Sequence, residues 1–328
     1  MKKAIYQLLI LLLFPLIMVS CSNEDSSTTS DQDTNPINEQ PPLEASDLYK
    51  IELNAEKINI PNDIIIENSK FTTGFDGENI YITRSVNNIK YMNSYNVNSH
   101  TTANLQIYDD TNFINGRMHY FNNDYSPMMI QYEDHIFRYS LVFQTWSKIE
   151  NSSDIIAKTR YKGTGILKDK MFFIGKDTDQ NNILSYNLIT GQWQEYNKIW
   201  RTKDFVDMVA VNDKLYCLSI AQNGKSMFQV DYNGVASKFG SYSFEARNNN
   251  LHSMAAIEDR FIFVLTQNHQ NKALYAFDTQ NPGWRGIPIS VNLDPYSTNI
   301  FSDNQYLYLV GKEVNGNKIS VYKITVNK

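Results

Sequence analysis

Cysteine, glycine and histidine are all scarce in this chain of 328 residues, and each shortage excludes a class of protein. The two cysteines, Cys21 and Cys217, cannot build a disulfide framework. The 14 glycines form neither a phosphate-binding loop nor a Gly-x-Ser-x-Gly nucleophile motif. The five histidines lie in separate stretches without the spacing of a metal site. We therefore expect no resident metal, no cofactor and no recognisable catalytic motif.

The acidic and the basic side chains are also not concentrated in any one part of the sequence. The 35 acidic and 30 basic side chains give a formal charge of −5 and are scattered along the chain. This distribution offers no electrostatic footprint for nucleic acid. Cys217 lies between Tyr216 and Leu218 in an apolar run, which predicts a buried and unreactive thiol.

One stretch begins like a calcium loop, Asp177-x-Asp179-x-Asn181. The glycine and the glutamate that an EF-hand needs further on are replaced by Asn182 and Leu188, so the EF-hand interpretation fails. A looser calcium site in that stretch is left as an alternative.

Long apolar runs are missing except at the start of the chain. Residues 1–21 begin with Lys2-Lys3 and continue with an apolar stretch, Leu8–Val19, that is short for a membrane span of about 20 residues. We interpret them as a targeting segment. The letters Met18–Cys21 resemble a bacterial lipobox, and the resemblance implies that Cys21 is lipidated and becomes the first residue of the mature protein. The alternative is an ordinary secretory signal with an incidental cysteine.

Residues 22–46 have no aromatic side chain and contain three prolines, so they cannot bury enough surface to fold. We predict a disordered tether. Its acidic start, Ser22–Ser26, is similar to the export signal of surface lipoproteins in Bacteroidota-type bacteria, although a plain solvated linker would look alike. The expected location is the outer membrane, on the cell surface or in the periplasmic leaflet.

The rest of the chain repeats. An aromatic or aliphatic residue that closes a strand recurs at intervals of 44, 47, 44, 47 and 45 residues. These positions are Tyr95, Tyr139, Tyr186, Val230, Phe277 and Tyr322. A tryptophan follows three of them by seven residues, and the equivalent positions in two other units are Thr102 and Ser237.

Each recurring position is preceded by a turn signal and an apolar strand, which gives about four strands per unit and six units. The turn signals are Asp76-Gly77, Asn115-Gly116, Lys168-Asp169, Asn212-Asp213, Glu258-Asp259 and Ser302-Asp303. A unit of four strands that repeats every 44 to 47 residues is typical of a β-propeller. A twisted β-sandwich with coincidental spacing is the alternative.

The segment Tyr186-x-x-x-Thr190-Gly191-x-Trp193 resembles the end of a kelch repeat. The resemblance covers roughly residues 50–328, within a domain that we place at residues 47–328. It implies an all-β, six-bladed propeller with four-stranded antiparallel blades, similar to the central domain of galactose oxidase. In that family the aromatic pair packs between blades. The Gly-Gly pair usual in kelch repeats is missing, so the chain would be a divergent member. We expect a monomeric propeller.

The ring also needs a joining strand. The last unit has room for only three strands before Lys328, whereas Tyr49–Pro61 alternates in polarity ahead of the first unit. We predict that this N-terminal stretch, Lys57–Ile60 especially, supplies the outer strand of the last blade and so avoids an open edge.

The turn signals are short, so the longer connections should gather on the opposite face, where binding residues are usually found. Side chains there that suit a sugar or a peptide combine aromatic faces with charged donors and acceptors. They are Arg160, Tyr161, Trp200, Arg201, Arg247, His252, Asp294 and Tyr296.

We expect a lipid-anchored binding module for a glycan, a peptide or an envelope protein. The alternative is a carbohydrate-active propeller enzyme, such as a mutarotase, epimerase or lyase, in which the arginines and His252 converge on the channel. A structural subunit of an envelope complex is a third possibility.

Overall fold

The computed structural model describes residues 47–61, 64–66, 71–87, 89–105, 117–120, 128–132, 135–140, 145–149, 160–176, 181–196, 204–221, 224–242, 251–266 and 273–328. All the described strands belong to one compact unit, Ala45–Lys328. The predicted leader with Cys21 and the predicted tether lie outside the described residues. None of the described helices is long and apolar enough to cross a membrane.

The described strands form six four-stranded antiparallel sheets. The first two sheets are β2 (Phe71–Phe75), β3 (Asn79–Val86), β4 (Ile89–Asn96) and β5 (Thr102–Leu105), and then β6 (Arg117–Tyr120), β7 (Met128–Tyr132), β8 (His135–Ser140) and β9 (Thr145–Lys148). The third and fourth sheets are β10 (Arg160–Leu167), β11 (Lys170–Lys176), β12 (Asn181–Asn187) and β13 (Trp193–Glu195), and then β14 (Asp204–Val211), β15 (Lys214–Ala221), β16 (Gly224–Asp231) and β17 (Ala236–Tyr242). The fifth and last sheets are β18 (Leu251–Ile257), β19 (Phe261–Thr266), β20 (Ala273–Asp278) and β21 (Trp284–Pro288), and then β22 (Leu293–Ser302), β23 (Leu307–Glu313), β24 (Ile319–Asn327) and β1 (Glu52–Ile58).

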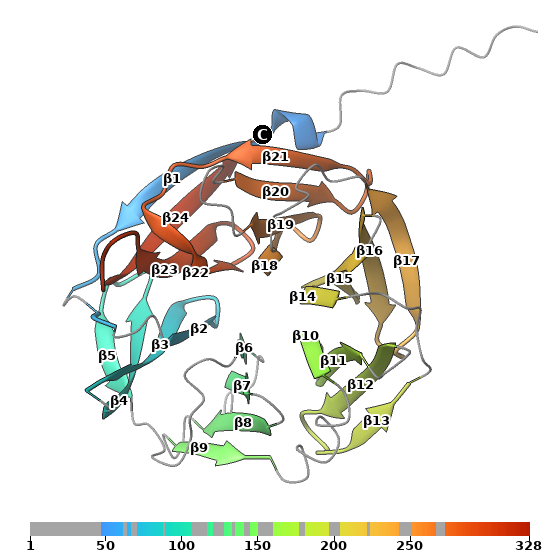
Figure 1. The fold of residues 1–328 in the computed structure, drawn as a ribbon, viewed down its shortest axis with the longest axis horizontal. Coiled ribbons are helices and arrows are strands. Elements are labelled where there is room, and N and C mark those ends of the chain that lie inside the picture. Colours follow the sequence, from blue (N-terminus) through green and yellow to red (C-terminus); the bar gives the residue numbers. More distant parts are fainter. Residues whose placement is uncertain are drawn as a thin grey trace, which may run out of the picture. The chain divides into compact units, whose positions relative to one another are not determined.

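The sheets stand around a common centre like the blades of a propeller (Figure 1). The first strand of each sheet lies innermost, and β2, β6, β10, β14, β18 and β22 are neighbours in that order. This arrangement confirms the predicted all-β propeller with four-stranded antiparallel blades.

The last sheet takes its outer strand from the N-terminal stretch, as predicted. β1 pairs antiparallel with β24 from Glu52↔Asn327 to Ile58↔Val321. The emphasis on Lys57–Ile60 is wrong, because the strand ends at Ile58 and begins five residues before Lys57. Ahead of β1, a short 3-10 helix, η1 (Asp47–Lys50), lies against β20 and β21 of the neighbouring sheet.

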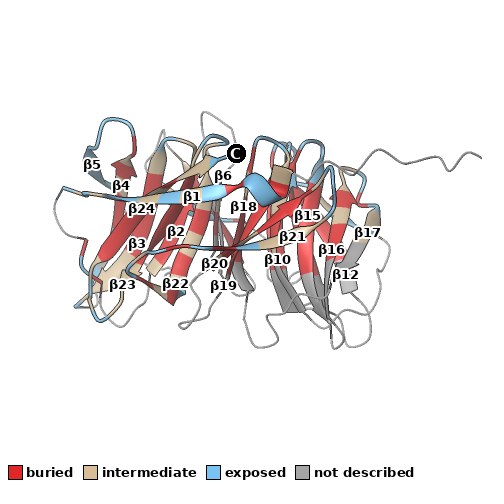
Figure 2. Cartoon of the chain, turned by 90° about the horizontal axis from the view of Figure 1, so that it is seen from above, coloured by how far each residue is buried: buried red, intermediate tan, exposed pale blue. Residues whose placement is uncertain are grey.

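The hydrophobic core is divided among the interfaces between neighbouring sheets. Six clusters of buried side chains each combine residues of two adjacent sheets. In one of them, Leu167 and Phe172 meet Met208 and Leu215 across the gap between the β10–β13 and β14–β17 sheets. Both faces of a middle strand are therefore buried, which explains the continuous apolar runs in the sequence. Figure 2 shows buried residues along the strands and exposed residues at the turns.

The recurring aromatic pairs belong to these interfaces. Tyr139 lies opposite Trp146 with ring centroids 5.1 Å apart, and the pairs Tyr186–Trp193 and Phe277–Trp284 are each at 4.9 Å. The prediction that Ser237 occupies the position of the tryptophan, opposite Val230, is wrong. Val230 pairs with Ala236, because the turn between β16 and β17 is one residue shorter than the others.

The predicted turn Asn115-Gly116 was also placed wrongly. These two residues lie outside the described part, but β6 begins only at Arg117 and pairs with β7. The connection between the first and second strands of this sheet therefore runs through residues 121–127. The next described residues, Met128–Tyr132, form strand β7.

Candidate functional site

The two ends of the ring differ in the strand features that they carry. All six innermost strands run in the same direction, because every sheet repeats the same up-and-down order. The end where β2, β6, β10, β14, β18 and β22 begin is called the strand-start end. Turns such as Lys168-Asp169 and Asn212-Asp213 follow these strands at the other end, called the short-turn end. The predicted binding residues that the structure describes, all in β10, β18 and β22, belong to the strand-start end.

Four innermost strands lose their regular pairing close to the strand-start end. The register shifts between Tyr161 and Gly163 in β10, and between Phe205 and Met208 in β14. It shifts between Leu251 and Ser253 in β18, and between Leu293 and Thr298 in β22. Such bulges bend a strand and redirect its side chains, and they are frequent beside functional sites.

Five of the predicted site residues lie at these irregularities. Arg160 and Tyr161 are the first two residues of β10, His252 is the extra residue in β18, and Asp294 and Tyr296 lie within the shifted part of β22. The prediction that they are loop residues is wrong, since all five belong to innermost strands. Sequence patterns missed this because a bulge interrupts the alternation that marks a strand. Trp200, Arg201 and Arg247 lie outside the described residues.

The irregular part of β22 is a closed local structure. The Asp294 carboxylate accepts a hydrogen bond from the Tyr296 amide at 3.1 Å, and the Thr298 hydroxyl donates to the Asp294 carbonyl at 2.6 Å. Thr298 is buried, whereas Tyr296 is 53% exposed. The hydrogen bonds therefore hold Tyr296 in place at the surface.

The bulge in β22 also depends on Gly311, which pairs with Thr298 across the sheet. A Cβ atom on Gly311 would lie 2.3 Å from Thr298 Oγ1 and 2.9 Å from Thr298 Cα. Because a backbone atom is involved, Gly311→Ala is expected to lower the free energy of unfolding by about 2 kcal/mol. Urea denaturation measures it.

Gly283→Ala is the control for that substitution, since its nearest neighbours lie at 3.6 Å, an ordinary contact distance. We expect it to stay within about 0.5 kcal/mol of the natural chain. Equal effects of the two substitutions would contradict the role given to Gly311.

Polar side chains link the innermost strands around the channel, and sequence reasoning missed them. Asn299 donates to Thr73 at 2.8 Å, and the Met254 amide donates to the Asp207 carboxylate at 3.0 Å. The Ser253 hydroxyl lies 3.3 Å from the Ile300 amide, and Thr164 Oγ1 lies 2.6 Å from His119 Nε2. Each link joins two neighbouring sheets.

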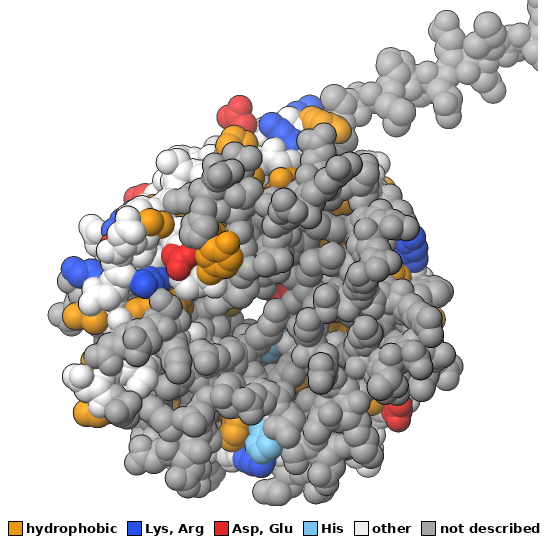
Figure 3. Space-filling model, viewed as in Figure 1, with side chains coloured by type: hydrophobic (Ala, Val, Ile, Leu, Met, Phe, Trp, Pro, Cys, Tyr) orange, Lys and Arg blue, Asp and Glu red, His pale blue; other side chains and the backbone are white. Residues whose placement is uncertain are grey.

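These links place polar groups along the innermost strands. A sequence signal for several of them exists, because Thr73, Thr164, Asp207, Ser253 and Asn299 all stand three to five residues before a short turn. Figure 3 shows an opening at the centre of the ring, viewed as in Figure 1. Hydroxyl, amide, carboxylate and imidazole groups offer hydrogen bonds to a polar ligand.

The described residues hold no group of three or more His, Cys, Asp or Glu side chains that could bind a metal ion. Cys217 is buried as predicted, and burial raises the pKa of its thiol. Asp177 and Asp179 lie outside the described residues, so the looser calcium site stays a prediction.

Comparison with known proteins supports the fold. No described protein family and no curated protein matches the sequence. Among solved structures, a protein of unknown function from Bacteroides thetaiotaomicron is similar, with a TM-score of 0.57, 11% identity, 84% of this chain covered and 76% of the other. A putative exported protein from Bacteroides fragilis has a TM-score of 0.55, 11% identity and coverages of 86% and 96%.

A luciferin-regenerating enzyme is also similar, with a TM-score of 0.56, 12% identity and coverages of 83% and 95%. Identities this low concern the fold and not the function. The chain is therefore a β-propeller with four-stranded antiparallel blades, similar in fold to a Bacteroides protein of unknown function and to a putative exported protein from the same genus.

Proposed function

We propose that this protein is a lipid-anchored, extracytoplasmic binding module that recognises a glycan at the strand-start end of its propeller. The observation that carries the proposal is the set of shared register breaks in β10, β14, β18 and β22. Three of the four breaks bring Arg160 and Tyr161, His252, and Asp294 and Tyr296 to the same end of the ring.

The chemistry of these residues suits sugars. An aromatic face stacks on the apolar face of a pyranose ring, and arginine and histidine donate hydrogen bonds to hydroxyl and carboxylate groups. Acidic sugars, such as uronic and sialic acids, would additionally pair with Arg160. A peptide or an envelope protein partner is the other ligand class that this surface could serve.

Two finer features belong to the same proposal. The working unit is a monomeric, divergent kelch-like propeller of six blades, joined into a ring by β1. Cys21 carries the lipid, and residues 22–46 lift the propeller from the outer membrane. Support for the leader comes from its lipobox-like letters and from the similarity in fold to a putative exported protein.

The test is a glycan panel that includes uronic and sialic acids, probed with the purified full chain and scored for binding and for product formation. Tyr296→Ala is expected to weaken binding roughly three- to tenfold through loss of a stacking face. Tyr49→Ala is the matched control, because Tyr49 is a tyrosine of similar exposure, 64%, on η1 and away from this end.

Binding without turnover supports the module, and turnover would instead support a carbohydrate-active enzyme. An equal loss in both tyrosine variants would remove the strand-start end from the proposal. If no glycan of the panel is bound or converted, a protein becomes the expected partner. Fractionation of the expressing cells tests the anchor, since Cys21→Ser should release the chain from the membrane fraction.

A further inference from the structure

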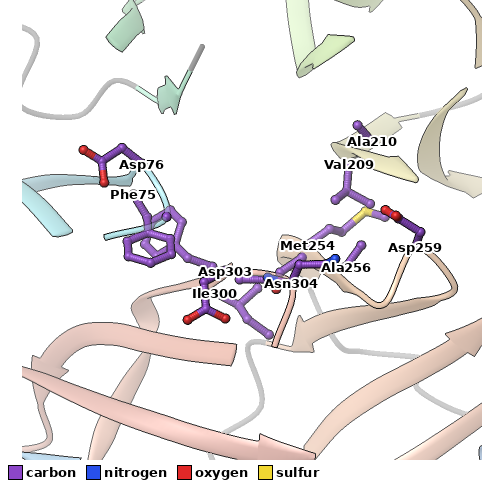
Figure 4. Close-up of a pocket in the computed structure, with 14 residues that line it drawn as sticks. Phe75, Asp76, Val209, Ala210, Met254, Ala256, Asp259, Ile300, Asp303 and Asn304 are labelled. Carbon is purple, nitrogen blue, oxygen red and sulfur yellow. Dashed lines mark hydrogen bonds between the residues drawn. The ribbon is translucent and has the colours of Figure 1, made fainter. Parts of the chain in front are cut away.

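A cavity of about 540 Å³ lies at the short-turn end of the channel, away from the proposed glycan site. Four sheets line it. Phe75 and Asp76 come from the first sheet, Val209 and Ala210 from β14, Met254 and Asp259 from β18 and its turn, and Ile300 and Asp303 from β22 and its turn. Figure 4 shows Phe75 and Asp76 on one side, Val209, Ala210 and Asp259 on the other, and Asp303 between them. The volume of the cavity is in the usual range for small-ligand sites, about 300–1,000 Å³.

The floor and the rim of this cavity differ in chemistry. Phe75, Met254 and Ile300 are buried and give an apolar floor. Asp76, Asp259 and Asp303 are more exposed and form an acidic rim. An apolar floor beneath a rim of one charge suits a ligand that combines a hydrocarbon stem with a charged head.

Hydrogen bonds fix two of the three rim side chains, Asp76 and Asp303. Asp76 accepts hydrogen bonds from the amides of Glu78 and Asn79 and from the Tyr81 hydroxyl, which are all neutral donors. Asp303 likewise accepts from the amides of Gln305 and Tyr306 and from the Tyr308 hydroxyl. Burial, reinforced by the bond to Asp303, raises the pKa of Tyr308, so the phenol keeps its proton and donates it to that bond.

Neighbouring cations are engaged elsewhere. Lys328 pairs with Glu258, and Arg260 pairs with Asp278 and Asp47. Among the ion pairs of the described residues, none includes Asp76, Asp259 or Asp303. Within the described part of the chain, no cation is therefore paired with the three rim side chains.

Hydrogen bonds between adjacent turns hold the rim in place. Asn212 Nδ2 donates to the Asp259 carbonyl at 2.9 Å, and the Glu258 amide donates to the Asn304 carbonyl at 3.4 Å. The turns of three consecutive sheets are thus tied together. A rim that is ordered before binding loses little entropy when a ligand arrives.

We propose that this cavity binds an organic cation, a guanidinium or ammonium group on a hydrocarbon stem. The stem lies on Phe75, Met254 and Ile300, and the acidic rim formed by Asp76, Asp259 and Asp303 attracts the cation. Such a group is supplied either by a free small molecule or by an arginine or lysine side chain of a peptide. This site is separate from the proposed glycan site.

Calorimetric titration of the full chain tests the proposal with Nα-acetyl-arginine amide, the neutral isostere Nα-acetyl-citrulline amide and the tripeptide Gly-Arg-Gly. We expect the arginine compound to bind at least roughly tenfold more tightly than the citrulline compound, because a hydrogen bond to a charged group is worth more than a neutral one. Tighter binding of the tripeptide identifies a peptide as the source. Equal or weaker binding of the tripeptide identifies a free small cation.

Asp259→Asn is the informative variant. The described contacts give the Asp259 carboxylate no hydrogen-bond role in the fold, and asparagine tolerates the φ of +48° at this position. Its affinity for the arginine compound should fall roughly tenfold. The control is Asp213→Asn on the neighbouring turn, where the carboxylate pairs with Lys168 outside the cavity lining, and it should leave the affinity unchanged.

Three results would overturn the proposal: equal affinity for the arginine and citrulline compounds, no heat with the arginine compound up to about 10 mM, well beyond the range of weak millimolar binding, or equal losses in the two Asp→Asn variants. The Tyr296→Ala chain should bind the arginine compound normally, so failure at the glycan site and failure here remain distinguishable.

Discussion

Deleting residues 47–58 is expected to lower the free energy of unfolding by at least about 5 kcal/mol and to make the chain self-associate. Leu48 and Ile51 are almost completely buried in the core between the β18–β21 sheet and the last sheet. Burial of one such side chain contributes about 1.5–3 kcal/mol. The deletion also removes all of β1 and exposes the backbone of β24, a nine-residue strand, to pairing with other molecules.

Urea denaturation and size-exclusion chromatography measure the two effects. The control is a deletion of equal length, residues 30–41, which leaves every described strand intact. An unchanged midpoint and a monomeric elution position for the 47–58 deletion would show that β1 does not hold the last sheet to its neighbours.

Replacing Arg260 by glutamine is expected to lower the free energy of unfolding by about 3 kcal/mol. Arg260 donates to both oxygens of Asp278, from Nε at 2.9 Å and from Nη2 at 2.6 Å, and the Asp278 side chain is 0% exposed. A third bond, from Nη1 to Asp47 at 2.9 Å, holds η1 against this sheet. Without the arginine, a buried carboxylate loses the cation that compensates it.

A double-mutant cycle separates this explanation from a general packing defect. Asp278→Asn in the Arg260→Gln background should recover part of the loss, because it removes the uncompensated charge. Lys50→Gln, which removes only the exposed lysine partner of Asp47, should have no measurable effect. Strictly additive effects of Arg260→Gln and Asp278→Asn would contradict the mechanism.

The pH dependence of this pair has a defined sign. Burial alone raises the pKa of Asp278, but the hydrogen bonds from Arg260 and from the amides of Gln280 and Asn281 outweigh it, so the pKa is lowered in the folded chain. A lowered pKa stabilises the fold above the ordinary aspartate value of about 3.9, and this stabilisation is lost as the pH falls through the folded-state value. The difference between the natural chain and Arg260→Gln should therefore be constant near neutrality and shrink in acid.

The sequence alone determined the repeating parts of this protein. Strand-closing residues such as Tyr139 and Phe277 recur at regular intervals, and three of them are followed seven residues later by a tryptophan. Together with short turns such as Lys168-Asp169, this repeat predicted the sheets of four strands that the structure contains. These features are local, since a turn and the strand pair around it are set by residues close in the chain. For the same reason the shorter turn between Val230 and Ala236 made only one prediction wrong, that of Ser237 as the partner of Val230. The predicted repeat of four-stranded sheets was not affected.

Tertiary structure decided where binding chemistry gathers. The extent of β1 depends on its pairing with β24, about 270 residues away, and the bulges that place His252 and Tyr296 follow from register with neighbouring strands. The carboxylates of Asp76, Asp259 and Asp303 come from three different sheets and share one cavity only because the blades are arranged around a common centre. No spacing along the chain encodes that meeting, because it results from packing between whole sheets.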